Sequence, residues 1–78
     1  MPTILRIGNY RFFFFSSDRE EPVHIHVERD DLIAKFWLDP IRLQESGGFN
    51  RSEVLKIKKI VEKNKITLLE AWNDYFNR

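Results

Sequence analysis

Pro22 to Leu38, PVHIHVERDDLIAKFWL, is the stretch that decides the fold. Apolar and polar residues alternate on both sides of Asp30-Asp31, which is typical of two half-buried strands joined by a two-residue turn. Successive side chains of a strand point to opposite faces of the sheet. One face of this predicted hairpin is apolar and is expected to join the core; it consists of Val23, Ile25, Val27, Leu32, Ala34, Phe36 and Leu38.

The opposite face of the hairpin is mostly polar and consists of His24, His26, Glu28, Ile33, Lys35 and Trp37. With a two-residue turn, His26 lies opposite Lys35, and His24 lies opposite Trp37. Both histidines of the chain then share one patch with a lysine and a tryptophan. This patch is the candidate functional site.

Length and composition restrict the class of protein. A chain of 78 residues is expected to form one domain, 1–78, with a β-rich part at 1–48 and a helical part at 49–78, and to bury a modest core. The absence of cysteine excludes disulfides, thiol catalysis and cysteine-ligated zinc. Arginines and a glycine interrupt the first apolar residues, so we expect no signal peptide, no membrane association and a cytoplasmic location.

A second hairpin is predicted near the start of the chain, with strands Thr3 to Ile7 and Tyr10 to Phe15, because Gly8-Asn9 supplies the positive φ angles of a tight turn. The expected pairs are Ile7 with Tyr10, Arg6 with Arg11, Leu5 with Phe12, and Ile4 with Phe13. Four consecutive phenylalanines place two rings on each face, so both faces need cover. The facing arginines repel each other unless a bound anion, or acids of the Ser16–Glu21 surface loop, neutralise them.

The remaining chain predicts helices. Ile41–Leu43, after Asp39-Pro40, fits either a short edge strand or a helical turn. Asn50 and Glu53 resemble a capping box that starts a helix. Its apolar stripe is Val54, Ile57 and Val61, and its opposite stripe is Lys56, Lys59 and Lys63.

A break near Asn64 favours two helices, although the spacing also permits one bent helix. The apolar residues of the second helical run are Leu68, Leu69, Trp72, Tyr75 and Phe76. The charge is uneven, since residues 1–48 carry six Lys/Arg against eight Asp/Glu and residues 49–78 carry seven against four. The second part is therefore the basic one. The predicted fold is α+β: two consecutive β-hairpins form an antiparallel sheet, and two C-terminal helices pack on one of its faces.

Four segments together resemble a known family: MPTILRIGNYRFFFFS, EPVHIHV, AKFWLDPIRL and GFNRSEVLKIKKIVEKNKITLLEAWNDYF. They are similar to the uncharacterised bacterial family called domain of unknown function 4160, from Pro2 to Phe76. Pro22-Val23 stands where the family usually has Pro-Pro, which changes the loop entry and keeps both histidines. Members are often encoded beside a second small protein, as in toxin-antitoxin pairs. The resemblance thus implies a toxin-like protein with a cognate small antitoxin-like partner.

The polar patch suggests RNA chemistry. Cleavage of RNA through its own 2′-hydroxyl requires a base, an acid and a cation that stabilises the charge developing on the phosphate. The candidate catalytic residues are His24, His26, Lys35 and Arg6. The candidate binding residues, which include rings for stacking a base, are Tyr10, Arg11, Trp37 and Glu28. A ribonuclease or translation inhibitor that needs no metal or other cofactor is therefore the leading hypothesis, with RNA as a candidate partner.

Three other interpretations remain open. A His-x-His strand can hold a metal, but two histidines are an incomplete ligand set and Glu28 lies farther along the strand, so no metal is assigned. The imidazoles can instead form only structural hydrogen bonds. Finally, the protein can be a non-enzymatic module that binds protein or nucleic acid through the lysine stripe or the C-terminal aromatic residues, and its phenylalanine-rich sheet is compatible with a homodimer.

Overall fold

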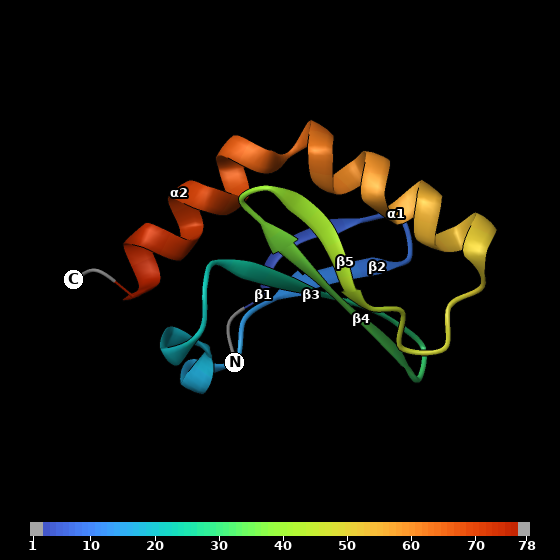
Figure 1. Cartoon of the computed structure of the whole chain (residues 1–78), viewed down its shortest axis with the longest axis horizontal. Coiled ribbons are helices and arrows are strands. Elements are labelled where there is room, and N and C mark those ends of the chain that lie inside the picture. Colours follow the sequence, from blue (N-terminus) through green and yellow to red (C-terminus); the bar gives the residue numbers. More distant parts are fainter. Residues whose placement is uncertain (1–2, 77–78) are drawn as a thin grey trace.

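The structure, a computed structural model, describes residues 3–76. Within this range one antiparallel sheet has five strands that lie side by side in chain order. They are β1 (Thr3–Ile7), β2 (Tyr10–Phe13), β3 (His24–Arg29), β4 (Leu32–Leu38) and β5 (Ile41–Glu45). Two consecutive helices, α1 (Arg51–Lys63) and α2 (Lys65–Phe76), then arch over one face of the sheet (Figure 1). The predicted α+β fold is confirmed, and the segment after the second hairpin is an edge strand.

The hairpin of β3 and β4 has the predicted register. His26 pairs with Lys35, and His24 pairs with Trp37. Asp30 at the turn has a φ of 55°, a left-handed conformation that aspartate tolerates better than most other residues. The apolar face is fully buried at Ile25, Val27, Ala34, Phe36 and Leu38, as expected.

The hairpin of β1 and β2 follows the predicted register only near its turn. Arg6 pairs with Arg11, but Phe13 pairs with Thr3 and not with Ile4. The pairing shifts between Thr3 and Leu5, so β1 carries an extra residue there, as in a β-bulge. The expected pair of Ile4 with Phe13 was therefore wrong, because alternation along a strand does not reveal such an insertion.

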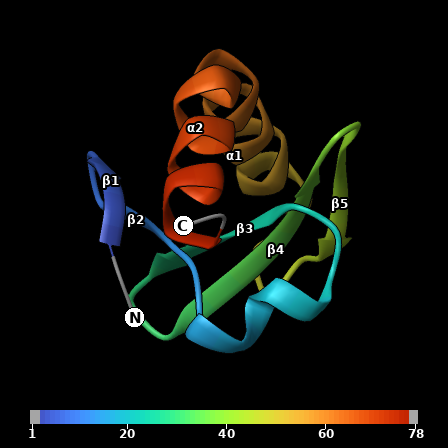
Figure 2. The ribbon, with the colours of Figure 1, turned by 90° about the vertical axis from the view of Figure 1, so that its left-hand side faces the viewer.

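The two helices cover the apolar face of the sheet. Phe12 and Phe14 belong to the core on this side, and the ring of Phe14 lies 5.1 Å from that of Trp72 in α2. Phe13 is fully buried on the opposite side, where its ring stacks 5.3 Å from His26. Figure 2 shows the sheet curling around the helices, with the short 3-10 helix η1 (Ser16–Glu20) on the side away from them.

The helix boundaries follow local signals. The Asn50 side chain accepts a hydrogen bond of 2.8 Å from the Glu53 backbone N–H and so caps α1. At the other end, the Asn64 side chain donates to the Ile60 carbonyl at 2.8 Å, which satisfies one of the last carbonyls of the helix. Asn64 is also the break between α1 and α2, as predicted.

Candidate functional site

The segment before β3 determines the surroundings of both histidines. The backbone N–H of Phe15 donates to Asp18 Oδ2 at 2.8 Å, which holds the Asp18 side chain at the start of η1. Asp18 is only 9% exposed, whereas its neighbours Ser17 and Arg19 are exposed. The sequence predicted a surface loop here. Most of the segment is at the surface, but one carboxylate points inward.

Asp18 meets both imidazoles of the chain. Its Oδ2 lies 3.1 Å from His26 Nε2 and 3.2 Å from His24 Nε2. The Nδ1 of His24 lies 2.8 Å from the Pro22 carbonyl oxygen. Because a carbonyl can only accept, this contact places the hydrogen of neutral His24 on Nδ1 and leaves its Nε2 without one.

Both imidazoles are enclosed. His24 is 0% exposed and His26 is 8% exposed, so the expectation that they lie on a partly open side was wrong. η1 covers them from one direction, and the Trp72 ring of α2 lies 5.1 Å from the ring of His24. Burial lowers the pKa of His26 below its ordinary 6.5, and the Asp18 carboxylate acts in the opposite direction.

Lys35 and Trp37 lie beside the histidines, as the register predicted. The Lys35 ammonium pairs with Glu21, lies 4.9 Å from the centre of the Trp37 ring and lowers the pKa of the Glu21 carboxyl. The Trp37 ring lies 5.7 Å from that of His24. Lys35 is therefore near the imidazoles, but an acid already neutralises it.

The other predicted site residues lie apart from the histidines. Arg11 donates to Glu28 at 2.8 Å and to Thr3 at 3.1 Å, so Glu28 neutralises this arginine, and neither an anion nor the loop is needed for that. Arg6 is exposed on β1, beside Arg11. Glu28, the acid considered as a third metal ligand, is thus paired with Arg11.

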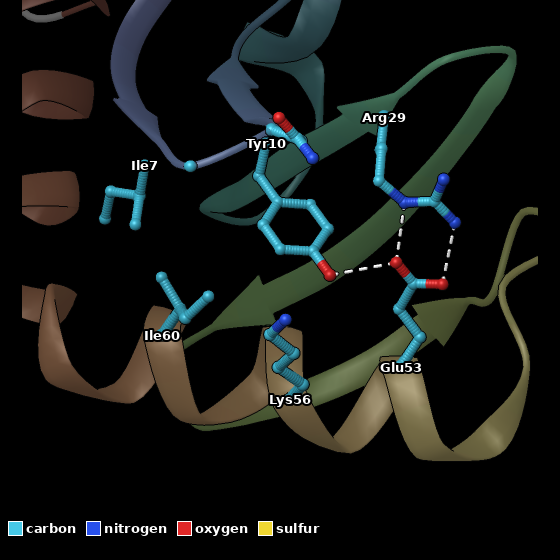
Figure 3. A pocket seen from close by; sticks show the side chains of 8 residues that line it. Ile7, Tyr10, Arg29, Glu53, Lys56 and Ile60 are labelled. Carbon is cyan, nitrogen blue, oxygen red and sulfur yellow. Dashed lines mark hydrogen bonds and ion pairs between the residues drawn. The ribbon is translucent and has the colours of Figure 1, made fainter.

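Tyr10 lies on the opposite face of the sheet from the histidines. Its hydroxyl donates to Glu53 Oε2 at 2.9 Å, and Arg29 binds the same carboxylate through Nε at 2.6 Å and through its terminal nitrogen at 2.7 Å (Figure 3). Tyr10 is 6% exposed and belongs to the core with α1. The Tyr10 ring is therefore not placed to stack a base beside the imidazoles, a role for which Tyr10 and Trp37 were the two candidates.

A cavity of about 430 Å³ adjoins this network. Its lining includes Gly8, Asn9, Lys56 and Ile60 in addition to the network residues. Hydrogen bonding to Arg29 is the main cause that holds the pKa of Glu53 below its ordinary value, and burial raises the pKa of Tyr10. The reciprocal half of the predicted capping box is absent from the described contacts of Glu53, because its carboxylate is engaged by Arg29 and Tyr10.

Two arrangements of chemical interest therefore exist in residues 3–76. One is the network of Tyr10, Arg29 and Glu53 with its adjoining cavity. The other is the cluster of Asp18, His24 and His26, whose ligand-type atoms lie within 4.8 Å of one another. Such a set can orient an imidazole as a base or hold a metal ion. Asp18 was not predicted as a site residue, because it stands in a polar run, Ser16 to Glu21, that is typical of a surface loop.

Comparison with known proteins gives a family and no reaction. No helix of the described residues is long and apolar enough to cross a membrane. No curated protein and no solved structure gives a significant match. The family model described as "Domain of unknown function (DUF4160)" matches residues 9–73, which is most of the chain. The chain therefore belongs to the DUF4160 family.

Proposed function

We propose that this protein is the toxin-like member of a two-gene pair and that it acts by binding RNA through the lysine face of α1, defined as Lys56, Lys59 and Lys63. The proposal rests on the difference in exposure between the lysines and the histidines. These three lysines are exposed, whereas both imidazoles are enclosed under η1. RNA can reach the lysine face of the folded protein directly, but it can reach His24 only if the covering segment moves.

The charge of α1 supports a phosphate ligand. This helix carries five Lys/Arg against two Asp/Glu, and one of the two acids, Glu53, is already bound by Arg29. Lysine binds phosphate as a point charge and does not read base sequence. The cavity beside Lys56 is within the size range of small-ligand sites, so it offers room for a nucleotide next to the lysine face.

A ribonuclease that uses the imidazoles is the second candidate. His26 keeps 8% exposure, and its Nε2 lies 3.1 Å from the Asp18 carboxylate, an arrangement that can orient a general base. For this function η1 would have to open. The binding function requires no such opening, and we therefore prefer it.

Growth after induced expression tests the proposal. The lysine-face variant Lys56→Gln/Lys59→Gln/Lys63→Gln removes three charges and keeps good helix formers. Its matched control removes three cations from other surfaces: Arg19→Gln/Arg42→Gln/Lys65→Gln. We expect growth arrest by the wild type and by the control but not by the lysine-face variant, with circular dichroism showing that all three fold.

The cognate protein encoded beside the chain is expected to restore growth when it is co-expressed with the wild type. His26→Gln, which keeps a donor for Asp18, is expected to remain toxic. Absence of arrest by the wild type, or equal arrest by the lysine-face variant, would contradict the proposal. Loss of arrest in a folded His26→Gln variant would instead support the ribonuclease.

A further inference from the structure

The cluster of Asp18, His24 and His26 has a feature that the RNA-binding function does not use. His24 Nε2 is fully buried and has no hydrogen-bond partner among residues 3–76. Its Nδ1 already donates to the Pro22 carbonyl, so neutral His24 carries a bare lone pair on Nε2. The Asp18 carboxylate, which is also an acceptor, lies 3.2 Å from this nitrogen. Two buried acceptors in contact cost free energy unless a proton or a metal cation lies between them.

We propose that Asp18, His24 and His26 bind a divalent transition-metal ion, which fastens η1 to β3. One carboxylate oxygen and two imidazole nitrogens, all within 4.8 Å of one another, form the three-ligand set that zinc and similar ions accept with a fourth position open. The metal satisfies the lone pair of His24 and the charge of Asp18 at once.

The surroundings of the cluster are those of metal ligands. A metal-bound histidine usually donates its other ring N–H to a carbonyl or carboxylate, and His24 donates to the Pro22 carbonyl at 2.8 Å. A bound carboxylate is usually hydrogen-bonded as well, and Asp18 accepts from the Phe15 backbone at 2.8 Å. Hydrogen bonds to the backbone therefore already orient two of the three proposed ligands, His24 and Asp18.

The enclosure of the cluster indicates that a bound metal would stabilise the fold. The side chains of Asp18 and His26 are each 11% exposed, and that of His24 is 0% exposed. A metal that binds only the folded chain adds its binding free energy to stability. In a domain of this size such a contribution is large relative to the core. This inference is independent of the lysine face.

Zinc titration of the untagged, chelator-treated full chain tests the site. We expect zinc to raise the melting temperature by at least about 10 °C at a hundredfold excess over its dissociation constant. The chain has only two histidines, and both are proposed ligands. The imidazole nitrogen NMR resonances of the wild type therefore report on metal binding at this site without any substitution. Zinc is expected to shift the Nε2 resonances of both His24 and His26. Absence of these shifts would overturn the proposal.

Matched variants separate this site from adventitious binding. Asp18→Asn keeps the size of the side chain and an oxygen for the Phe15 N–H, and it is expected to weaken zinc binding at least about tenfold. The control is Glu28→Gln, since Glu28 is an acid on the same face that pairs with Arg11 instead of the cluster. This variant is expected to leave zinc binding unchanged. Equal zinc binding by Asp18→Asn and the wild type, or loss of binding in Glu28→Gln, would overturn the assignment. The NMR experiment remains decisive if Asp18→Asn does not fold.

Discussion

At the level of single residues, the buried carboxylate of Asp18 sets the environment of both imidazoles. The sequence showed that His24 and His26 share a face, and alternation along β3 was sufficient for that. It did not show their burial, because Asp18 sits in a run of polar residues in which Glu20 and Glu21 look like equally good partners. Only the hydrogen bond from Phe15 distinguishes Asp18.

Glu53 leads to a pH-dependent prediction. The Arg29 guanidinium holds the pKa of Glu53 below its ordinary 4.5. A carboxyl whose pKa is lowered by folding stabilises the protein above its unfolded pKa, and this stability is lost as the pH falls through the folded pKa. The free energy of unfolding of the wild type should therefore exceed that of Glu53→Gln at pH 7, and the difference should shrink below about pH 4.5.

Urea unfolding of the two proteins between pH 7 and pH 3 measures this difference. Arg29→Gln provides the control background, because the pH-dependent contribution of Glu53 should be much smaller once its main partner is removed. A difference that does not change with pH, or one that is equally large in the Arg29→Gln background, would show that this ion pair does not act as described.

At the level of elements, the strands and helices were predicted from the sequence more completely than the candidate site was. The turn residues and the alternation of side chains gave the two hairpins, and the asparagines at positions 50 and 64 marked the ends of α1. The bulge in β1 and the 3-10 turn of η1 were missed, because both depend on local geometry that alternation does not encode. β5 was left open between strand and helix, since its run of residues is too short to decide.

The turn between β5 and α1 gives an element-level prediction. A Cβ at Gly47 would lie 1.7 Å from the Ile33 carbonyl oxygen, and the φ of Gly47 is +62°. Gly8 has a similar φ of +57° with nothing within 4 Å of its Cβ position. Gly8→Ala should therefore cost about 1 kcal/mol from backbone conformation alone, and Gly47→Ala should cost clearly more. Urea unfolding compares them, and a smaller or equal loss at Gly47 would disprove this close approach.

At the level of the whole molecule, the contacts that join distant segments could not be predicted from the sequence. Glu53 meets Arg29 across 24 residues and Tyr10 across 43. Helical periodicity shows which stripe of α1 faces the sheet, but it does not show where along the sheet the helix crosses. The same docking leaves the lysine face outward, while η1 closes the histidine side. The described part of the chain thus combines an enclosed polar cluster with an accessible basic surface.

The central claim is that RNA binds the exposed lysine face and not the enclosed histidine cluster. The salt dependence of RNA binding tests this claim most directly. A single-stranded RNA is titrated with the wild type, the lysine-face variant and the matched control over a series of salt concentrations. The account predicts that the lysine-face variant binds more weakly and that its slope of log affinity against log salt is smaller by about 2, since each lost phosphate contact on a single strand removes about 0.7. The control should keep the slope of the wild type. Equal affinity and slope for the lysine-face variant and the wild type would contradict the account.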